Sequence, residues 1–283
     1  MNYGIFGINL GACANPAIAA RVARAAEDAG FDSVWTGEHV VLPDPQVPPS
    51  PVPPSVPFLD PAVALAFIAA HTKTIRLATG IIILPQRNPL VLAKELASVD
   101  VVSGGRLVFG IGVGYLKPEF DALNVPFERK GRRADEYLEA MLAMWTQEKP
   151  AYRGEFVSFG GIDAQPRPVQ KPHPPIVIGG STPAAFRRAV RRGNGWYGYN
   201  MDLDATRGAI AALREAEKKV DRPGRLGRLE ITVSPPPALG LDEVPRYEEL
   251  GVDRVVLLNF RGSEDDLVRF VDDAASRLLR RRP

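Results

Sequence analysis

The chain has 283 residues, of which 45% are hydrophobic and 24% are charged, and its formal net charge is +2. This composition is typical of a globular enzyme with a sizeable core, and the nearly balanced charge argues against electrostatic nucleic-acid binding. Cys13 is the single cysteine, which excludes a disulfide framework and a cysteine metal cluster. We expect a cytoplasmic protein, because the sequence has no signal-peptide pattern and no run of about 18 apolar residues that would span a membrane.

Short apolar runs recur along the chain and predict eight β-strands. Their ranges are Tyr3–Asn9, Ser33–Gly37, Ile75–Ile83, Arg106–Gly112, Pro175–Gly180, Gly195–Asn200, Leu229–Pro235 and Asp253–Asn259. Several of these runs are almost continuously apolar, as expected of parallel strands that are buried on both faces of a sheet.

A helical pattern follows each predicted strand. The ranges are Pro16–Gly30, Asp60–Thr72, Asn88–Gly105, Gly131–Gln147, Ser181–Gly193, Asp204–Val220, Leu241–Gly251 and Ser263–Arg280. Asp60 and Asn88 each precede a proline, which is the arrangement of an N-cap followed by the first helical residue. Eight strand–helix units predict one domain over residues 1–283, an α/β fold of the (β/α)₈ TIM-barrel type, rather than a doubly wound sheet.

Two insertions interrupt this rhythm. The segment from Leu42 to Asp60, after the second strand, is too rich in proline for a helix and is expected to run as a stiff, extended loop. The segment from Ala151 to Pro175, before the fifth strand, contains a Tyr-Arg-Gly-Glu-Phe core that predicts a small hairpin.

The fourth predicted strand leads into Gly110, Gly112 and Gly114. A Rossmann fingerprint would place the third glycine one residue later and open a helix directly, whereas a loop that includes Lys117 follows here. The motif therefore argues against NAD binding. In a barrel, Gly112 to Tyr115 would lie at the C-terminal rim, where ligands bind. Glycines there either let a flat ligand or a phosphate approach the backbone, or leave room inside a crowded barrel.

The second strand ends at Glu38 and His39, which would lie on the same rim. A histidine at that position is suited to proton transfer. The alternative is a histidine that only forms hydrogen bonds within the protein and has no catalytic role. The other histidines, His71 and His173, form no metal-binding pattern with it, so no metal site is expected. The absence of a Gly-x-Ser-x-Gly motif argues against an α/β-hydrolase.

Glycines and hydroxyls also join the fifth strand to its helix. Gly179, Gly180, Ser181 and Thr182 would place free N–H groups at a helix N-terminus, which favours binding of a phosphate. Plain N-capping by one of the two hydroxyls is the alternative, but capping does not require two glycines before it. Gly80 in the third strand indicates a bulge or the close approach of a ligand.

Three segments together resemble the luciferase-like monooxygenase superfamily, especially its coenzyme F-420-dependent oxidoreductases of actinobacterial type. They are AAEDAGFDSVWTGEHVVLP, the stretch from Arg76 to Thr146, and KPHPPIVIGGSTPAAFRRAVRRGNGWY. The resemblance implies a TIM barrel whose rim holds a flavin or deazaflavin. Flavin-using relatives share much of the pattern, so FMN is the alternative cofactor.

The resemblance also implies roles for particular residues. A bulge, often with a cis peptide, is expected at Gly80–Ile81 behind the central ring of the cofactor. His39 matches the ring-side histidine of the family, and Glu38 beside it would reach the cofactor or orient the site. The implied cofactor-binding residues are Gly80, Ile81, Gly112, Val113, Gly114, Tyr115, Gly179, Gly180, Ser181, Thr182 and Trp196.

Each of three further positions allows two roles. Arg129 and Arg132 either reach the cofactor phosphate or belong to a solvated helix start. The sugar-phosphate dehydrogenases of the superfamily carry a glutamate acid shortly after the fourth-strand glycines, where this chain has Tyr115. Tyr115 would supply a phenolic donor or take no part in proton transfer, so the substrate class of those enzymes does not carry over.

The expected activity is hydride transfer between the C5 atom of F-420 and a small organic substrate, with His39 as the proton donor or acceptor. A monooxygenase that uses reduced FMN and oxygen is one alternative, and a flavin- or deazaflavin-binding barrel without turnover is another. The resemblance suggests a homodimer, and no nucleic-acid or membrane partner is expected. The basic stretches RRAVRR and RLLRRRP either attract the polyglutamate tail of F-420 or are solvated helix ends.

Overall fold

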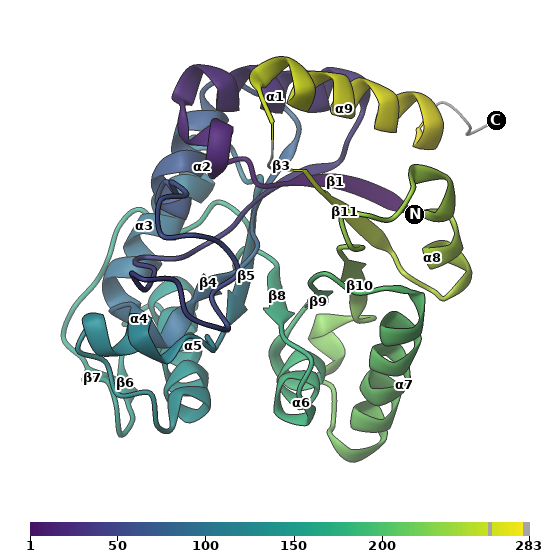
Figure 1. Cartoon of the computed structure of the whole chain (residues 1–283). Helices are drawn as coiled ribbons and strands as arrows, with labels where there is room; N and C mark the ends of the chain where they lie inside the picture. The colour runs from purple at the N-terminus through teal and green to yellow at the C-terminus, as the bar shows by residue number, and fades with distance from the viewer. Residues whose placement is uncertain (260–261, 280–283) are drawn as a thin grey trace.

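A computed structural model describes residues 1–259 and 262–279, and within them parallel strands close into a barrel surrounded by helices (Figure 1). The barrel strands are β1 (Asn2–Phe6), β2 (Ser33–Thr36), β3 (Arg76–Thr79) with β4 (Ile82–Ile83), β5 (Leu107–Gly112), β8 (Ile176–Gly179), β9 (Gly195–Gly198), β10 (Glu230–Val233) and β11 (Arg254–Leu258). Pairing of β1 with both β2 and β11 closes the ring. The predicted TIM barrel is confirmed.

The third barrel strand is divided in two. β3 pairs with the first half of β5 through Leu77 and Leu107, and β4 pairs with the second half through Ile82 and Ile111. Gly80 and Ile81 lie between the two pieces and are joined by a cis peptide bond. The predicted continuous strand Ile75–Ile83 is therefore broken at the position where a bulge was expected.

The helices follow the strands in the predicted order. They are α1 (Pro16–Ala29), α2 (Pro61–Ala69), α3 (Pro89–Val102), α4 (Lys117–Ala122), α5 (Lys130–Thr146), α6 (Pro183–Arg192), α7 (Leu203–Lys219), α8 (Arg246–Glu249) and α9 (Glu264–Leu278). Asp60 and Asn88 cap α2 and α3 as predicted, since their carboxylate and amide oxygens accept hydrogen bonds from the backbone N–H groups of the second and third residues that follow them. Thr182, rather than Ser181, caps α6.

Two segments differ from the prediction, and part of a third lies outside the described residues. The expected loop after Gly114 contains α4, a short helix that begins with Lys117 and Pro118. The predicted helix Leu241–Gly251 is reduced to a 3₁₀ turn and α8, because Pro245 has no N–H group to continue a helix through this point. The end of the arginine-rich stretch RLLRRRP, from residue 280 onward, lies outside the described residues.

Both insertions agree with their predicted character. In the second insertion, β6 (Tyr152–Arg153) and β7 (Ser158–Phe159) form the expected antiparallel hairpin. The proline-rich segment contains no helix, and an isolated antiparallel bridge joins its Phe58 to Leu10 after β1.

The core has two layers. Helices pack around the outside of the barrel, while the barrel interior is filled by side chains from most of its strands. Trp35 and Tyr197 are the largest interior groups, and their ring centroids lie 5.2 Å apart. These rings fill the barrel, so a ligand has space only at an end of it. In the part of the chain that the structure describes, no helix is both long and apolar enough to cross a membrane.

Replacing Gly110 by alanine is expected to lower the free energy of unfolding by about 1–3 kcal/mol or more, because the added Cβ would collide with the backbone oxygen of Thr79. Thr79 is held in place, since its hydroxyl accepts a hydrogen bond from the Gly110 N–H and donates one to the Gly110 carbonyl. Gly208 is a matched control in the exposed face of α7, with open space at its Cβ position.

Gly208→Ala should stabilise the protein by about 0.5–1 kcal/mol, because alanine has the higher helix propensity. Denaturant unfolding followed by circular dichroism measures both changes. Equal unfolding free energies for the two variants would contradict this account of the packing around Gly110.

Candidate functional site

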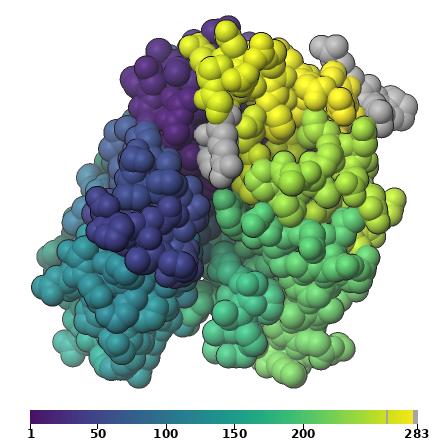
Figure 2. All heavy atoms as spheres, in the orientation of Figure 1, coloured from purple at the N-terminus to yellow at the C-terminus, as the bar shows by residue number. Residues whose placement is uncertain are grey.

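A cavity of about 430 Å³ opens at the carboxyl ends of the barrel strands. Figure 2 shows the surface furrow that leads to this region, between the dark blue and the green parts of the molecule. The volume of the cavity lies within the range of small-molecule and cofactor sites. The lining is mainly backbone, aliphatic and aromatic: Phe6, Leu10, Gly37, Glu38, His39, Pro51, Val52, Phe58, Gly80, Ile81, Ile83, Gly112, Val113, Gly114, Tyr115, Gly179, Gly180, Ser181, Thr182, Ala185, Tyr197, Gly198, Tyr199 and Met201.

The structure brings almost all predicted site residues together around this cavity. They come from the ends of four separate strands. The lining includes Glu38 and His39 after β2, Gly80 and Ile81 at the bulge, residues 112–115 at the end of β5, and residues 179–182 before α6. Trp196 is the exception. Its ring is fully buried behind the wall, and its indole N–H donates to the Gly180 carbonyl at 2.8 Å. The expectation that Trp196 walls the site is wrong, because alternate residues of a strand face opposite sides and Tyr197 faces the cavity instead.

Ile81 lines the cavity, and glycines on the neighbouring strands make room for its side chain. A Cβ at Gly112 would collide with the end of the Ile81 side chain, and one at Gly179 would approach it to 3.2 Å. Gly114 has a φ of 73°, which favours glycine, and its Cβ would lie 2.7 Å from Ile83. The glycines of β5 thus leave space for the bulge, while the backbone from Gly112 to Tyr115 lines the cavity.

The segment before α6 forms another part of the wall. Gly180 has a φ of 113°, and Thr182 accepts a hydrogen bond from the Ala185 N–H at 3.2 Å. Capping therefore uses the Thr182 hydroxyl. The N-terminus of α6 nevertheless points its positive end toward the cavity region, since Ser181, Thr182 and Ala185 all line it.

Arg129 and Arg132 do not reach the cavity. Both form ion pairs with Glu155 in the hairpin insertion, and Arg132 does so at 3.0 Å. The expectation that they bind a phosphate is therefore wrong, and the alternative of a solvated helix start is confirmed, with side chains about half exposed or more.

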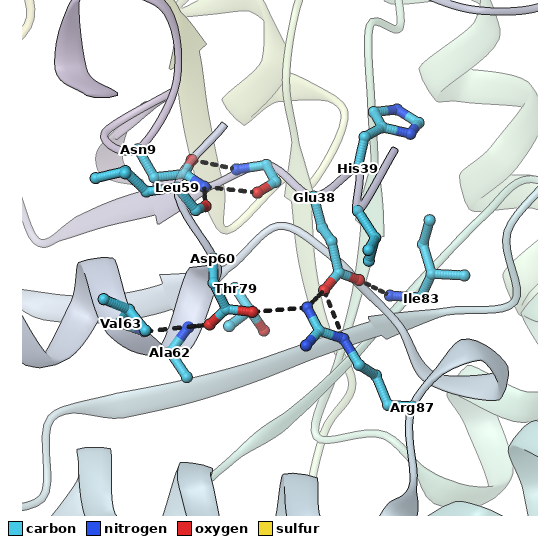
Figure 3. A network of polar contacts seen from close by, with 12 residues as sticks. Asn9, Glu38, His39, Leu59, Asp60, Ala62, Val63, Thr79, Ile83 and Arg87 are labelled. Atoms are coloured by element: carbon cyan, nitrogen blue, oxygen red, sulfur yellow. Dashed lines mark hydrogen bonds and ion pairs between the residues drawn. The ribbon is translucent and has the colours of Figure 1, made fainter. Parts of the chain in front are cut away.

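Glu38 is held in a network of charges at the rim (Figure 3). Its buried carboxylate accepts hydrogen bonds from the Ile83 backbone N–H and from Arg87, which also pairs with Asp60 at 2.8 Å. Burial raises the pKa of Glu38, and the positive charge of Arg87 opposes that effect. Burial of the Arg87 guanidinium lowers its pKa, but the charge and hydrogen bonds of Glu38 have the larger effect, so the pKa of Arg87 is raised overall. The network joins the end of β2 to the end of β4 and the start of α2.

His39 points away from this network (Figure 3) and packs among aromatic rings. Its ring meets Phe58 edge-on with centroids 5.6 Å apart, and Tyr115 edge-on at 6.2 Å. Its Nδ1 atom lies 3.4 Å from a carboxylate oxygen of Glu119, whose other oxygen accepts the Val40 N–H at 2.7 Å. A histidine in the cavity wall with a buried carboxylate behind it can hold or move a proton.

Tyr115 and Tyr199 flank the cavity with half-exposed side chains. Partial burial, and then the nearby Tyr199 and Glu119, raise the pKa of Tyr115 to about 12. Tyr115 is therefore a neutral phenol at physiological pH, able to donate a hydrogen bond but poorly suited to lose its proton.

Sequence analysis missed Arg87, Glu119 and Asn9. Asn9 donates to the carbonyls of Gly37 and Leu59 and accepts the Gly37 N–H, so it ties the proline-rich segment to β2. Glu119 lies on α4, which was predicted as loop. A proline at the first turn with an acidic residue next to it, as in Lys117-Pro118-Glu119, is a recognisable helix-start signal that would have located it.

The family profile of luciferase-like monooxygenases matches residues 6–269, which includes the whole cavity. The chain belongs to the luciferase-like monooxygenase family. In this family it is similar to an uncharacterised protein of Mycobacterium tuberculosis, with 34% identity over 98% of this chain and 99% of that one. An FMNH2-dependent dimethylsulfone monooxygenase of Pseudomonas putida is 32% identical over 53% of this chain and 44% of its own length.

Among solved structures of luciferase-like fold, one similar to this chain is the coenzyme F-420-dependent tetrahydromethanopterin reductase of Methanopyrus kandleri. The two superpose with a TM-score of 0.77 at 17% identity, over 99% of this chain and 98% of the reductase. At this identity the similarity establishes the shared fold. Membership of the family supports an enzyme of the oxidoreductase or monooxygenase kind.

Arg87→Met is expected to destabilise the protein by about 3–5 kcal/mol at neutral pH, because it leaves the Glu38 carboxylate buried without its cation. Loss of Arg87 raises the pKa of Glu38 further, so the folded variant takes up a proton that the unfolded chain releases. The penalty is therefore largest at pH 7–8 and shrinks as the pH falls toward 5.

Urea unfolding of Arg87→Met and of the double variant Glu38→Gln/Arg87→Met, at several pH values, checks this. The double variant should show little of the pH dependence, since it has no carboxyl at position 38. A penalty for Arg87→Met that stays constant from pH 5 to pH 8 would refute the coupling.

Proposed function

We propose that this protein binds coenzyme F-420 in the cavity and exchanges a hydride between it and a small organic substrate. The observation that supports the proposal is the position of His39 in the wall of a cavity that is otherwise lined largely by glycines, backbone and Ile81. A flat ring system requires such an apolar wall without projecting side chains, and a proton-transfer group beside it.

The residues present fit the expected cofactor. Ile81 offers an aliphatic face to a ring, and the backbone from Gly112 to Tyr115 leads along the cavity edge. At Gly180, a Cβ would come within 3.2 Å of Ala185, so a larger residue would crowd the wall in front of α6. These features suit a narrow chain that runs from the ring to the helix N-terminus.

At the position of the phosphate, the local charge favours a phosphodiester, as in F-420, over the terminal phosphate of FMN. None of the described residues that line the cavity is a lysine or an arginine, and Arg129 and Arg132 are paired with Glu155. The phosphodiester of F-420 carries one negative charge, whereas the terminal phosphate of FMN carries nearly two at pH 7. A helix N-terminus with hydroxyl groups is equivalent to about half a positive charge, which matches the phosphodiester better.

When bound, a deazaflavin supplies two-electron hydride exchange without oxygen activation. The chain supplies the proton chemistry. A substrate alcohol that gives up a hydride also gives up its hydroxyl proton, and His39 would take that proton at a ring nitrogen. In the opposite direction, His39 returns the proton to the carbonyl oxygen. Glu119 holds the imidazole from behind and Tyr115 contributes a neutral phenol at the entrance.

A monooxygenase that uses reduced FMN is the second candidate. It is favoured by the similarity to the dimethylsulfone monooxygenase, which covers about half of this chain. A barrel that binds flavin without turnover is a third possibility in principle, but the open cavity beside His39 offers space for a substrate and favours catalysis.

His39→Ala should reduce turnover by about 10²–10⁴-fold while changing the dissociation constant of F-420 by less than about threefold, because a proton-transfer group acts mainly in the transition state. The assay follows oxidation of reduced F-420 with a panel of small ketones, alongside a fluorescence titration with F-420. His71→Ala is the control, since the partly buried His71 lies just after α2 next to Phe67 and is not among the residues that line the cavity. Parallel losses of turnover and affinity in His39→Ala would exclude this role.

A further inference from the structure

The indole of Trp35 lies in the barrel interior, in contact with the bulge of the third strand, and is fully buried. A Cβ built on Gly80 would lie 3.0 Å from the indole Cε3 atom, and a Cβ built on Gly4 would lie 3.0 Å from the indole Nε1 atom. These two atoms belong to different rings of the indole. The side chain therefore spans the space between β1 and the bulge, and a glycine leaves room for it at each side.

Trp35 also contacts the part of the interior from which the cavity wall is built. Its ring centroid lies 5.2 Å from that of Tyr197, with 32° between the ring planes. Tyr197 lines the cavity and forms a hydrogen bond of 2.7 Å with the hydroxyl of Ser234. Ile81 packs against the same interior cluster. Because protein interiors are close-packed and transmit displacements, a rotation of the indole would move two parts of the wall.

A chain of hydrogen bonds from the opposite end of the barrel holds the indole. The Nε1–H group of Trp35 donates to the hydroxyl of Ser33 at 2.9 Å, and this hydroxyl donates to the Asp32 carboxylate at 2.6 Å. Asp32 is ion-paired with the buried Arg254 at 2.8 Å. Since a carboxylate can only accept, the Ser33 hydroxyl has to donate to Asp32, which leaves its oxygen free to accept from the indole.

The other two tryptophans of the chain are held differently. The indole N–H of Trp145 donates to the Ala93 carbonyl at 3.0 Å, and that of Trp196 donates to the Gly180 carbonyl at 2.8 Å. Both acceptors are backbone groups. The orientation of Trp35 depends instead on a side-chain hydroxyl, whose own direction is set by a neighbouring charge.

We infer that Ser33 and Asp32 are positioning residues for the cavity wall. They fix the rotation of Trp35, and Trp35 fixes the bulge and Tyr197, against which a flavin or deazaflavin ring would lie. Neither residue lines the cavity, so both act through the indole. The inference rests on the proposed function for the identity of the ligand. The placement of the wall belongs to the protein without ligand and is measured there.

Ser33→Ala tests the inference, because it leaves the buried indole N–H without its acceptor. Ser103→Ala is the matched control. The Ser103 hydroxyl is also buried, donates to the Asp100 carbonyl at 3.1 Å and accepts the Arg106 N–H at 3.2 Å, but Ser103 does not line the cavity. The readouts are the δ1-methyl NMR resonance of Ile81 in the ligand-free protein and the dissociation constant of F-420, measured by fluorescence.

In Ser33→Ala, the Ile81 methyl resonance is expected to shift and the dissociation constant of F-420 to rise at least about fivefold, since an unpaired buried donor is unfavourable and the indole rotates away. In Ser103→Ala, the resonance should stay in place and the dissociation constant should change less than about twofold. Denaturant unfolding shows that each variant is folded under the assay conditions. A loss of stability in Ser33→Ala without a shift of the Ile81 resonance would overturn the inference.

A double-mutant cycle separates the indole from other effects of Ser33. Trp35→Phe removes the N–H group, so adding Ser33→Ala to it should change neither the Ile81 resonance nor the dissociation constant further. An effect of Ser33→Ala of the same size in both backgrounds would contradict action through Trp35. Trp145→Phe controls for the loss of an indole elsewhere and should leave both readouts unchanged. If the wild-type protein does not bind F-420, the proposed function fails, while the ligand-free NMR comparison still decides the positioning role.

Discussion

The packing of Ile81 against the glycines of its neighbouring strands is the constraint on which the site depends. The third barrel strand breaks at Gly80–Ile81, and this break turns the Ile81 side chain into the space over Gly112 and Gly179. Gly110 has no side chain because the Thr79 carbonyl occupies that position, and Gly80 has none because Thr36 and Trp35 lie within about 3.0 Å of its Cβ position. The bulge, the glycine ladder and the smooth wall of the cavity are therefore one packing arrangement.

The rim is organised around the bulge by polar contacts that join distant segments. Glu38 binds the Ile83 N–H just after the bulge and Arg87 one turn later, and Arg87 extends the link to Asp60 at the start of α2. Asn9 connects the ends of β1 and β2 with the proline-rich segment (Figure 3). Glu38 and His39 both follow β2 and line the cavity, but Glu38 is already engaged by Ile83 and Arg87, so His39 is the one of the two that remains available to a ligand. Glu38 and His39 point in different directions because side chains alternate along an extended chain.

Much of the fold was predictable from the sequence, because each barrel strand is a short apolar run and several helices have a local start signal such as Asp60-Pro61 or Asn88-Pro89. The gathering of the rim residues was also predictable, since the carboxyl ends of parallel barrel strands meet at one face. The purpose of Gly110 and Gly112 was not, because it depends on how far Ile81 projects from another strand. The pairings of Glu38 with Arg87 and of His39 with Glu119 join residues 49 and 80 positions apart, and no local pattern announces them. Trp196 was assigned to the wrong face of its strand, because the sequence alone does not show which of the neighbours Trp196 and Tyr197 points toward the cavity.

We propose that this cavity holds a deazaflavin, against a wall shaped by Ile81 and an anion-binding helix N-terminus without a lysine or arginine among the described lining residues. A fluorescence titration of the purified protein with F-420 and FMN, side by side at the same ionic strength, tests it most directly. The account predicts that F-420 binds with a dissociation constant in the micromolar range or below, and FMN at least about tenfold more weakly. Tight binding of FMN without detectable binding of F-420 would contradict it.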